Sequence, residues 1–428
     1  MDRYEEYKDS GVEWIGEIPA GWEVRRISSL YEARNEKVSD RDYPPLSVTM
    51  QGIVPQLETA AKTQDGENRK LVKSGDFAIN SRSDRRGACG ISAYDGSVTL
   101  ITNVLAPKDQ ASMNPRYYSH LFRSEGFADE YYRQGTGIVD DLWSTNWTRM
   151  KNILVACPSL VEQASIAEYL DAKTTEIDSL VEDCEREVEL LREYRKAVIS
   201  EAVTKGLDPN APMKDSGIDW IGKTPEGWQV AQLGRLCETR NGLDYDATQV
   251  CGASDEGSVL VIRSGNVSSG QLVLDDCLYI RKEVPDQLLL RKGDVVIVRT
   301  NGSKELVGKS ALVKTDGVGT LGAFMLLCRS RFGRYINWLL QSTMLTNYMG
   351  AFSTSTVNQL SNGVLRRFHV PFPAEAVQEE ICNYLDAKTA EIDSLIADYQ
   401  SMADKLREYR KSLISEAVTG KFKVPGVA

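Results

Sequence analysis

The sequence predicts an α+β protein in which two pseudo-symmetric α/β heads alternate with two long helices. Three observations carry this prediction. Two segments of the chain occur twice, the longer of them has the apolar spacing of a helix, and the regions between the copies hold short strand-like runs. The length of 428 residues suits two to four domains of roughly 100–200 residues each.

The internal repeat is visible by direct comparison of the chain with itself. Residues 8–22 (KDSGVEWIGEIPAGW) recur as residues 214–228 (KDSGIDWIGKTPEGW). Residues 163–204 recur as residues 378–419 without a gap, and 26 of these 42 positions are identical. The chain therefore consists of two units, each with a head followed by a repeated block.

The heads differ from each other far more than the repeated blocks do. Residues 23–157 and 229–372 match only in fragments, such as LVKSGDFAI (71–79) against LLRKGDVVI (289–297). Two like connectors that carry two unlike heads predict a protein that recognises two different things.

Each long block predicts one helix. Apolar residues recur at steps of three, four and seven, starting at Ile166 in one copy and Ile381 in the other. The run SLVE (159–162) is typical of a capping box, and Gly206 and Gly420 are typical of helix ends. A helix of some 42–45 residues is about 63–68 Å long and cannot bury its apolar seam alone. We therefore expect the two helices to pack on each other.

The heads are expected to be mixed α/β, because short strand-like runs and turn signals occur without a regular strand–helix alternation. The expected strands are Phe77–Ile79, Val98–Ile101, Val259–Arg263, Val295–Arg299 and Ala323–Arg329. The expected helices are Tyr117–Phe122 and Ile336–Met344. LDPNAP (207–212) is typical of a linker.

The net charge of −10 argues against nucleic acid only until its location is considered. Residues 161–205 hold 6 basic and 12 acidic side chains, and residues 376–421 hold 6 and 9, so the heads are nearly neutral. Polar and basic residues follow strands of both heads and suit contacts to phosphates and base edges, although such loops are often only solvated. These candidate DNA contacts are Asn80, Arg82, Arg85, Arg86, Arg263, Asn266, Arg299, Asn301, Ser303 and Lys304.

Basic residues also interrupt the apolar pattern of the two helical blocks at matching places. They suit either long side chains that reach water from the edge of the seam or contact with another protein. The candidate partner contacts are Lys173, Arg195, Lys196, Lys388, Arg410 and Lys411.

The sequence offers no catalytic constellation and no metal site. GSKELVGKS (302–310) has five residues between its glycines where a P-loop needs four, and GVGTLG (317–322) precedes a strand instead of a helix. The two histidines, His120 and His369, have no ligand spacing. Eight scattered cysteines without a C-x-x-C pair, no apolar span and no signal core predict a cytoplasmic protein.

The repeated residues carry a family resemblance. W-I-G with x-P-x-G-W, K-S-G-D in one head and R-K-G-D in the other, Y-L-D-x-K-T-x-E-I-D-x-L and L-R-E-Y-R-K-x-x-I-S-E-A-V-T together resemble the DNA specificity subunit of type I restriction-modification systems. The match covers essentially the whole chain in the order head, helix, head, helix. Gln378-Glu379 reverses the order of Glu162-Gln163, and LVACP (154–158) is a loose version of VPFP (370–373).

The resemblance implies two target-recognition domains separated by an antiparallel pair of helices that form a coiled coil. Each head would read one half of a split, asymmetric DNA site. Two methyltransferase subunits would bring S-adenosylmethionine, and two motor/nuclease restriction subunits would bring ATP and Mg, so this chain would bind no cofactor and catalyse nothing. The implied parts are 1–21, a repeat segment near the end of the second helix; 22–158, the first head; 159–206, the first helix; 207–227, a linker; 228–373, the second head; 374–421, the second helix; and 422–428, a tail.

Three other interpretations stay open on the sequence alone. The chain could be a purely structural coiled-coil tether, or a stand-alone ATPase built on residues 302–310. Within the same family, it could serve a methylation-only system or a fused methyltransferase–nuclease. Because residues 8–22 repeat the segment that follows the first helix, we also expect the N-terminal segment to pack near the end of the second helix.

Overall fold

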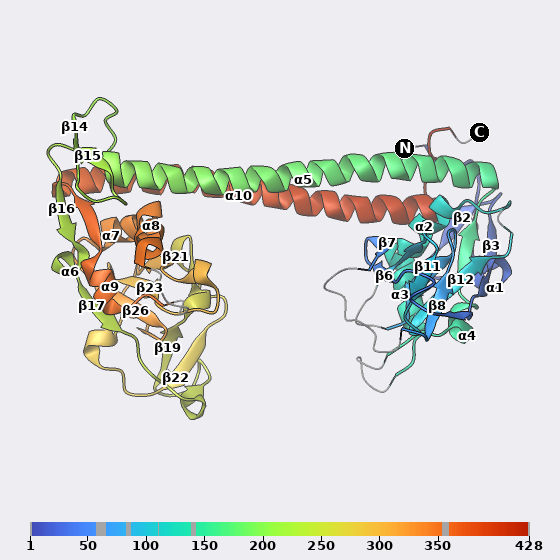
Figure 1. Cartoon of the computed structure of the whole chain (residues 1–428), viewed down its shortest axis with the longest axis horizontal. Helices are drawn as coiled ribbons and strands as arrows, with labels where there is room; N and C mark the ends of the chain where they lie inside the picture. Colours follow the sequence, from blue (N-terminus) through green and yellow to red (C-terminus); the bar gives the residue numbers. More distant parts are fainter. Residues whose placement is uncertain are drawn as a thin grey trace. The chain divides into compact units, whose positions relative to one another are not determined.

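The chain folds into two compact units, each with one head and part of two long helices. Unit 1 is Met1–Glu185 with Ser401–Ala428, and unit 2 is Arg186–Gln400. The long helices are α5 (Leu160–Lys205) and α10 (Glu375–Val418), as Figure 1 shows. The predicted fold class, mixed α/β heads with a pair of long helices, is confirmed. The computed structural model describes residues 2–56, 66–82, 87–109, 111–137, 143–352 and 359–426.

Head 1, residues 22–158, is built on a four-stranded antiparallel sheet with the order β10-β9-β12-β4 and a three-stranded sheet with the order β11-β8-β5. The apolar sequence of β9 (Phe77–Asn80) lets this central strand be buried along its whole length. The other strands of unit 1 are β1 (Tyr7–Asp9), β2 (Glu17–Pro19), β3 (Glu23–Arg26), β4 (Tyr31–Ala33), β5 (Lys37–Val38), β6 (Leu46–Thr49), β7 (Gly52–Pro55), β8 (Arg69–Val72), β10 (Cys89–Ile91), β11 (Gly96–Val98), β12 (Thr102–Pro107) and β13 (Leu154–Cys157).

Two short helices pack aromatic side chains against this sheet. The rings of Phe122 and Phe77 lie 4.3 Å apart between centroids, and both side chains are fully buried. Ser124 separates the two helices in an extended conformation, and its side chain accepts from Phe127 N to cap the second. The helices of head 1 are α1 (Ile27–Leu30), α2 (Pro115–Arg123), α3 (Glu125–Arg133) and α4 (Trp147–Met150).

Head 2, residues 228–373, has a six-stranded sheet with the order β17-β26-β23-β24-β21-β20 and a four-stranded sheet with the order β18-β22-β19-β25. The pairs β21–β24 and β19–β25 are parallel and the other pairs of these sheets are antiparallel. The strands of unit 2 are β14 (Met213–Asp215), β15 (Lys223–Pro225), β16 (Gln229–Gln232), β17 (Glu238–Asn241), β18 (Val250–Cys251), β19 (Ser258–Ile262), β20 (Val267–Ser268), β21 (Gly270–Leu272), β22 (Leu278–Arg281), β23 (Val295–Val298), β24 (Ser310–Leu312), β25 (Thr320–Leu321), β26 (Met325–Arg329) and β27 (His369–Phe372).

The helices of head 2 correct one prediction. The apolar run Ile336–Met344 suggested a single helix, but Ser342 is extended, with φ −75° and ψ 164°, and divides it into α7 and α8. This break corresponds to Ser124 in head 1. The short helices of unit 2 are α6 (Leu233–Leu236), α7 (Gly333–Gln341), α8 (Thr343–Phe352), α9 (Asn362–Arg367) and the 3-10 turns η3 (Ala247–Gln249), η4 (Ser264–Asn266), η5 (Asp286–Leu288) and η6 (Lys304–Leu306).

In head 1, the expected strand Val98–Ile101 is also displaced, because β11 already ends at Val98 and Ile101 is exposed.

The matching K-S-G-D (73–76) and R-K-G-D (291–294) motifs have the same structural role in the two heads. Asp76 and Asp294 are almost fully buried, and each accepts a hydrogen bond from the backbone amide three residues earlier, which closes a tight turn before a central strand. Each also binds an arginine at the end of another strand of the same sheet: Arg34, just after β4, has Nε 2.6 Å from Asp76, and Arg329 of β26 has Nε 2.8 Å from Asp294. The motifs therefore anchor the strands that lead to the candidate DNA loops.

The long helices begin and end as their sequence predicts. Ser159 and Glu162 form the predicted capping box, since Glu162 N donates to Ser159 Oγ and Ser159 N donates to Glu162. Gly206 and Gly420 follow the last turns with φ of 77° and 71°, a conformation that favours glycine. In unit 1 the helices run antiparallel, since Asp178 pairs with Arg410 and the later Glu185 pairs with the earlier Arg407.

The N-terminal segment packs against the residues that follow α10, all within unit 1. Tyr7 Oη donates to Lys421 O at 3.1 Å, and Lys421 Nζ donates to the carbonyls of Ile15 and Glu17 at 2.7 and 2.6 Å. A bridge between Asp2 and Lys423 brings the two ends of the chain together (Figure 1).

Candidate nucleic-acid interface and helix surface

The first candidate loop follows β9 in head 1. Asn80 is only 6% exposed, and its Oδ1 accepts from Arg82 N at 3.0 Å. The Arg82 side chain is exposed. The Arg82 backbone forms an isolated β-bridge with Ser144, which lies in the segment after α3. Arg85 and Arg86 lie outside the described residues. The loop thus presents one described arginine to solvent beside a buried asparagine.

The second candidate loop follows β23 in head 2. With the Gln359 amide oxygen turned toward the guanidinium, Arg299 Nε and Nη2 donate to it at 3.1 and 2.7 Å. Asn301 Oδ1 accepts from Ser303 N at 3.0 Å, which closes a turn. The side chain of Lys304 lies outside the described residues. Arg299 is therefore held by its own head, whereas Ser303 is exposed.

The two loops are equivalent, but their arginines are not. In head 1, Ser81 O accepts from Thr145 N at 3.0 Å, and in head 2 Arg299 O accepts from Leu360 N at 2.8 Å. Ser81 therefore corresponds to Arg299, and Arg82 corresponds to the next residue of head 2. Because successive residues of an extended chain point to opposite sides, Arg82 and Arg299 do not occupy the same place on the two heads.

Asn266 and Arg263 form a third turn, and their side chains bond mainly to other atoms of that turn. Asn266 is 2% exposed, its Oδ1 accepts from Arg263 N at 3.0 Å, and its Nδ2 donates to the carbonyls of Val273 and Asp276, each at 3.0 Å. Arg263 Nη2 pairs with Asp276 Oδ2 at 3.0 Å. The structure gives Asn266 a structural role, because both amide hydrogens are used within the turn.

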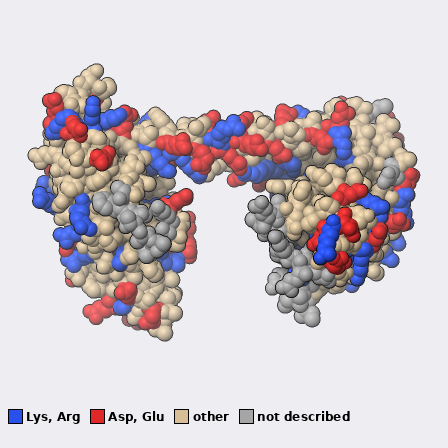
Figure 2. Space-filling model, in the orientation of Figure 1, with Lys and Arg blue, Asp and Glu red and all other residues tan. Residues whose placement is uncertain are grey.

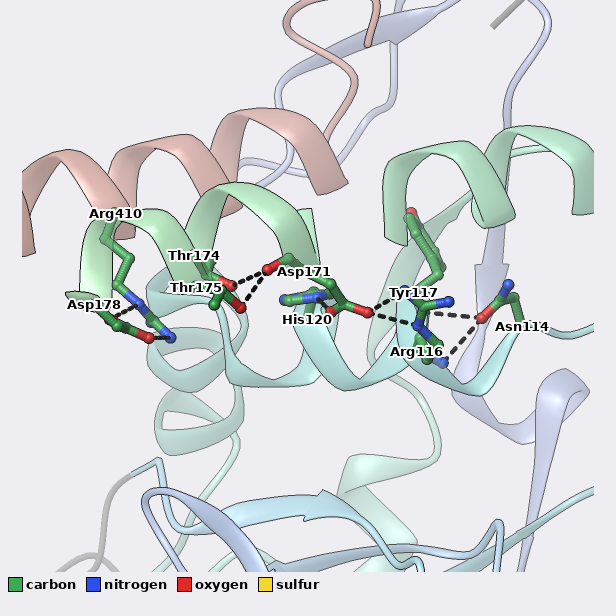
Figure 3. Close-up of polar contacts among 9 residues, drawn as sticks. All are labelled: Asn114, Arg116, Tyr117, His120, Asp171, Thr174, Thr175, Asp178 and Arg410. Atoms are coloured by element: carbon green, nitrogen blue, oxygen red, sulfur yellow. Dashed lines mark hydrogen bonds and ion pairs between the residues drawn. The ribbon is translucent and has the colours of Figure 1, made fainter. Parts of the chain in front are cut away.

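Each head is fixed to the start of the helix that follows it by a matched ion pair. In unit 1, Arg116 Nε donates to Asp171 Oδ2 at 2.5 Å, and in unit 2, Arg334 binds Asp386 with Nε at 3.1 Å. Figure 3 shows Arg116 and His120 converging on Asp171 from α2. Sequence reasoning missed these contacts. Their only signal was an R-Y pair in each head and the identical Y-L-D-A-K-T in each helix.

Each head is also fixed to the end of the other helix. Tyr117 Oη lies 3.1 Å from Ala156 O and 3.1 Å from Val418 O of α10. Tyr335 Oη lies 3.3 Å from Pro371 O and 3.5 Å from Val203 O of α5. The same buried hydroxyl therefore joins a head strand to a helix end in both units.

His120 distinguishes the junction of unit 1. Its Nε2 lies 2.6 Å from Asp171 Oδ1, and its side chain is largely buried. Burial lowers the pKa of His120 below its ordinary value, although the contact with Asp171 acts in the opposite direction. The corresponding position of head 2 is Trp338, so only this junction carries a titratable ring at that place.

The arginines predicted to contact a partner are used between the helices. Arg195 Nε lies 2.8 Å from Asp393 Oδ1 in unit 2, and Arg410 Nε lies 2.8 Å from Asp178 Oδ1 in unit 1. The two pairs occupy identical positions of the repeat. They fit the interpretation that both arginines lie at the edge of the apolar seam between the helices. Arg407 adds a pair with Glu185 in unit 1.

The four predicted lysines remain on the helix surface. Lys173 and Lys388 each pair with the glutamate one turn later, at 2.7 and 2.9 Å. Lys411 Nζ pairs with Glu125 Oε1 of head 1 at 2.7 Å, while Lys196, its counterpart in unit 2, is exposed. On the face shown in Figure 2, charged side chains of both signs lie along the helices.

The helices also expose apolar side chains at equivalent positions of the repeat. Leu180 and Leu395 are 45% and 47% exposed, and Tyr194 and Tyr409 are 50% and 48% exposed. Exposed leucine and tyrosine are the kind of residue that protein interfaces bury. The repeat has therefore kept the exposure of these side chains as well as their identity. We call these four residues the helix patches.

Further features of the described residues concern disulfides, metal sites, membrane-spanning helices and a nucleotide-binding loop. All eight cysteines lie within it, and each is a free thiol. Among the described residues, no cluster of metal-binding side chains is present, and none of the helices is both long and apolar enough to cross a membrane. The P-loop-like run 302–310 leads into strand β24 and not into a helix.

Comparison with known proteins identifies the relatives of this fold. No protein-family model matches the chain. The type I restriction enzyme EcoKI specificity subunit of Escherichia coli is 27% identical over 205 residues. The type I restriction enzyme MjaVIII specificity subunit of Methanocaldococcus jannaschii is 22% identical over 423 residues, 95% of this chain and 94% of that protein. The chain is a homologue of type I restriction enzyme specificity subunits.

The extent of the likeness to specificity subunits differs among these relatives. The match to the EcoKI subunit covers 47% of this chain and 44% of that protein, so it spans less than half of that relative. A solved chain from a study of the assembly and conformational transition of a type I R-M system superposes with a TM-score of 0.72 at 14% identity, over 94% of this chain and 98% of the other. That superposition shows that this chain shares its fold with the solved chain over nearly its whole length.

Proposed function

We propose that the chain is the sequence-specific DNA-binding subunit of a type I restriction-modification complex, and that each head reads one half of a split, asymmetric site. One observation carries this proposal. The two heads are fixed to the helices by the same contacts, Arg116–Asp171 and Arg334–Asp386, yet their loops differ in sequence and in the placement of arginine. Two heads that are held by the same repeated contacts but carry different loops suit the reading of two different half-sites.

The helix patches are an argument that the chain binds two identical partner subunits. Leu180 with Leu395 and Tyr194 with Tyr409 present the same side chain at nearly the same exposure. Two copies of one partner need two like docking surfaces. The proposed partners are two methyltransferase subunits, which would bind S-adenosylmethionine and methylate adenine, and two motor/nuclease restriction subunits, which would use ATP and Mg.

In this division of labour the chain contributes recognition and catalyses nothing. Lys173 and Lys388 lie on the same exposed helix surface and extend the proposed docking areas. Arg195 and Arg410 hold the two helices together beneath it. The heads would contact double-stranded DNA through the loops that follow β9 and β23.

The test is deletion of the chain from its host, followed by sequencing of methylated adenines. We expect one split motif to disappear on deletion and to return when the intact chain is restored. Persistence of every motif after deletion would refute the proposed function. If the motif disappears but the host cuts no unmodified DNA, the complex belongs to a methylation-only system instead.

A further inference from the structure

A small pocket opens beside the end of β9 in head 1. Its walls include the rings of Phe122, Tyr131, Tyr132 and Trp143, and Asn80 and Arg82 lie at its polar side. The rings of Tyr132 and Trp143 stack with their centroids 5.6 Å apart. The hollow has room for a group of about the size of a methyl, but not for a base taken out of the helix.

Asn80 offers this pocket a hydrogen-bond donor. The side chain is more than nine-tenths buried, and its Oδ1 already accepts from Arg82 N at 3.0 Å. Within the part of the chain that the structure describes, its Nδ2 has no hydrogen-bond partner. Asn80 Nδ2 is not among the fully buried polar atoms that lack a partner, so solvent reaches it, and a ligand acceptor can replace that solvent.

The polar atoms of the neighbouring walls are already used within head 1. Tyr131 Oη donates to Thr145 O and accepts from Asn103 Nδ2, both at 2.9 Å. Trp143 Nε1 donates to Tyr132 O at 2.9 Å, and Thr145 Oγ1 donates to Tyr131 O at 2.8 Å. The pocket therefore combines an apolar aromatic lining with the amide donor of Asn80.

Thymine presents the complementary pair of groups in the major groove. Its O4 accepts a hydrogen bond, and its C5-methyl group lies next to O4 on the same edge. Cytosine offers a donor and no methyl there, adenine adds a donor beside its acceptor, and guanine offers acceptors without a methyl. Among the four bases, only thymine fills an apolar hollow while it accepts from Asn80.

We propose that this pocket reads one thymine of the half-site recognised by head 1, with Asn80 Nδ2 donating to O4 and the C5-methyl group resting against the aromatic walls. The exposed Arg82 at the rim would contact the adjacent phosphate. This inference rests on the proposed function and specifies one residue of its site. Head 2 has apolar Val298 at the position of Asn80, so it lacks this donor and reads its half-site by other means.

The test uses the chain in complex with its methyltransferase subunits and the motif found by methylation sequencing. Each thymine of the head-1 half-site is replaced, one at a time, by deoxyuridine, which lacks only the methyl group. Loss of one buried methyl should weaken binding about four-fold at one position. A 5-methylcytosine paired with guanine at that position keeps the methyl, replaces O4 by a donor, and should bind at least ten-fold more weakly.

Two variants separate the donor from the hollow. Asn80→Asp keeps the oxygen that accepts from Arg82 N but removes the Nδ2 donor, and should weaken binding of the thymine duplex about ten-fold while head 2 still reads its half-site. Ala128→Leu fills the hollow from α3, so thymine and deoxyuridine should bind equally. Thr346→Leu, at the corresponding place on α8, is the matched control and should keep the four-fold difference.

Three results would overturn the inference: a head-1 half-site without thymine, equal binding of thymine and deoxyuridine at every position, or a four-fold difference that survives Ala128→Leu. Each of these leaves the proposed function intact, provided that deletion of the chain still abolishes the motif. If deletion leaves the motif in place, the proposed function itself fails.

Discussion

A matched insertion in both long helices should lengthen the spacer between the two half-sites. The insertion adds four residues after Glu185 in α5 and four after Gln400 in α10, where one unit gives way to the other. The interhelical pairs Asp178–Arg410, Glu185–Arg407 and Arg195–Asp393 each lie within one unit. Both inserted segments therefore leave these pairs, and the head–helix contacts of each unit, unchanged.

The size of the effect follows from helix geometry. Four residues add about 6 Å to a helix and turn its end by about 40°. About 6 Å corresponds to nearly two base pairs at roughly 3.4 Å each, and about 40° is close to the rotation of one base pair along a turn of about 10.5. We therefore predict a non-specific spacer that is longer by one or two base pairs, with both half-sites unchanged.

Methylation sequencing of a strain that carries the double insertion reads the spacer directly. A four-residue insertion in α5 alone is the control, because it shifts one helix against the other, separates Arg195 from Asp393 and should abolish methylation. An active double-insertion variant with the original spacer would refute the view that the helices set the distance. So would a variant in which a half-site changed.

The other expectations concern the loops and the head–helix junctions. If Arg82 contacts phosphate as proposed, Arg82→Ala should weaken binding of all sequences alike and reduce the salt dependence. Competition binding at two salt concentrations tests this, and a loss of about 1–3 kcal/mol confined to one relaxed position would show that Arg82 reads a base instead. Asp171→Asn and Asp386→Asn should each lower the free energy of unfolding by about 1 kcal/mol in denaturant titrations, because both replace a partly exposed ion pair. Burial lowers the pKa of His120 in the folded chain. As the pH falls, His120 therefore becomes protonated in the unfolded chain before it does in the folded chain, and unit 1 should lose stability below about pH 6.5. His120→Gln should flatten the fall in melting temperature between about pH 7 and pH 5.

The helices and the division into two heads could be predicted from the sequence because their signals are local and periodic. The spacing of apolar residues from Ile166 onward, the Ser159–Glu162 box and the glycines after each helix are all found where expected. The break at Ser342 was missed, because a single extended serine inside an apolar run leaves the helical spacing intact.

The candidate site could be predicted only in part. Sequence reasoning found the loops that follow the matching strands of the two heads, but it could not show which of their side chains are used within the head or how the two loops correspond. Both depend on contacts that no local pattern reveals. The Asn266 amide is used by carbonyls several residues away, and the register of the two loops is set by bridges to distant segments. The same limit hid the ion pairs of Asp171 and Asp386, whose partners lie in another part of each unit.

Exchange of one head tests the central claim most directly. Residues 22–158 are replaced by the first head of another specificity subunit with a known motif, and methylated adenines are sequenced in a strain that carries only the hybrid. Because each head is fixed to the helices by its own set of contacts, we predict that one half of the motif changes to that of the donor while the other half is retained. A motif in which both halves change, or neither, would contradict the account.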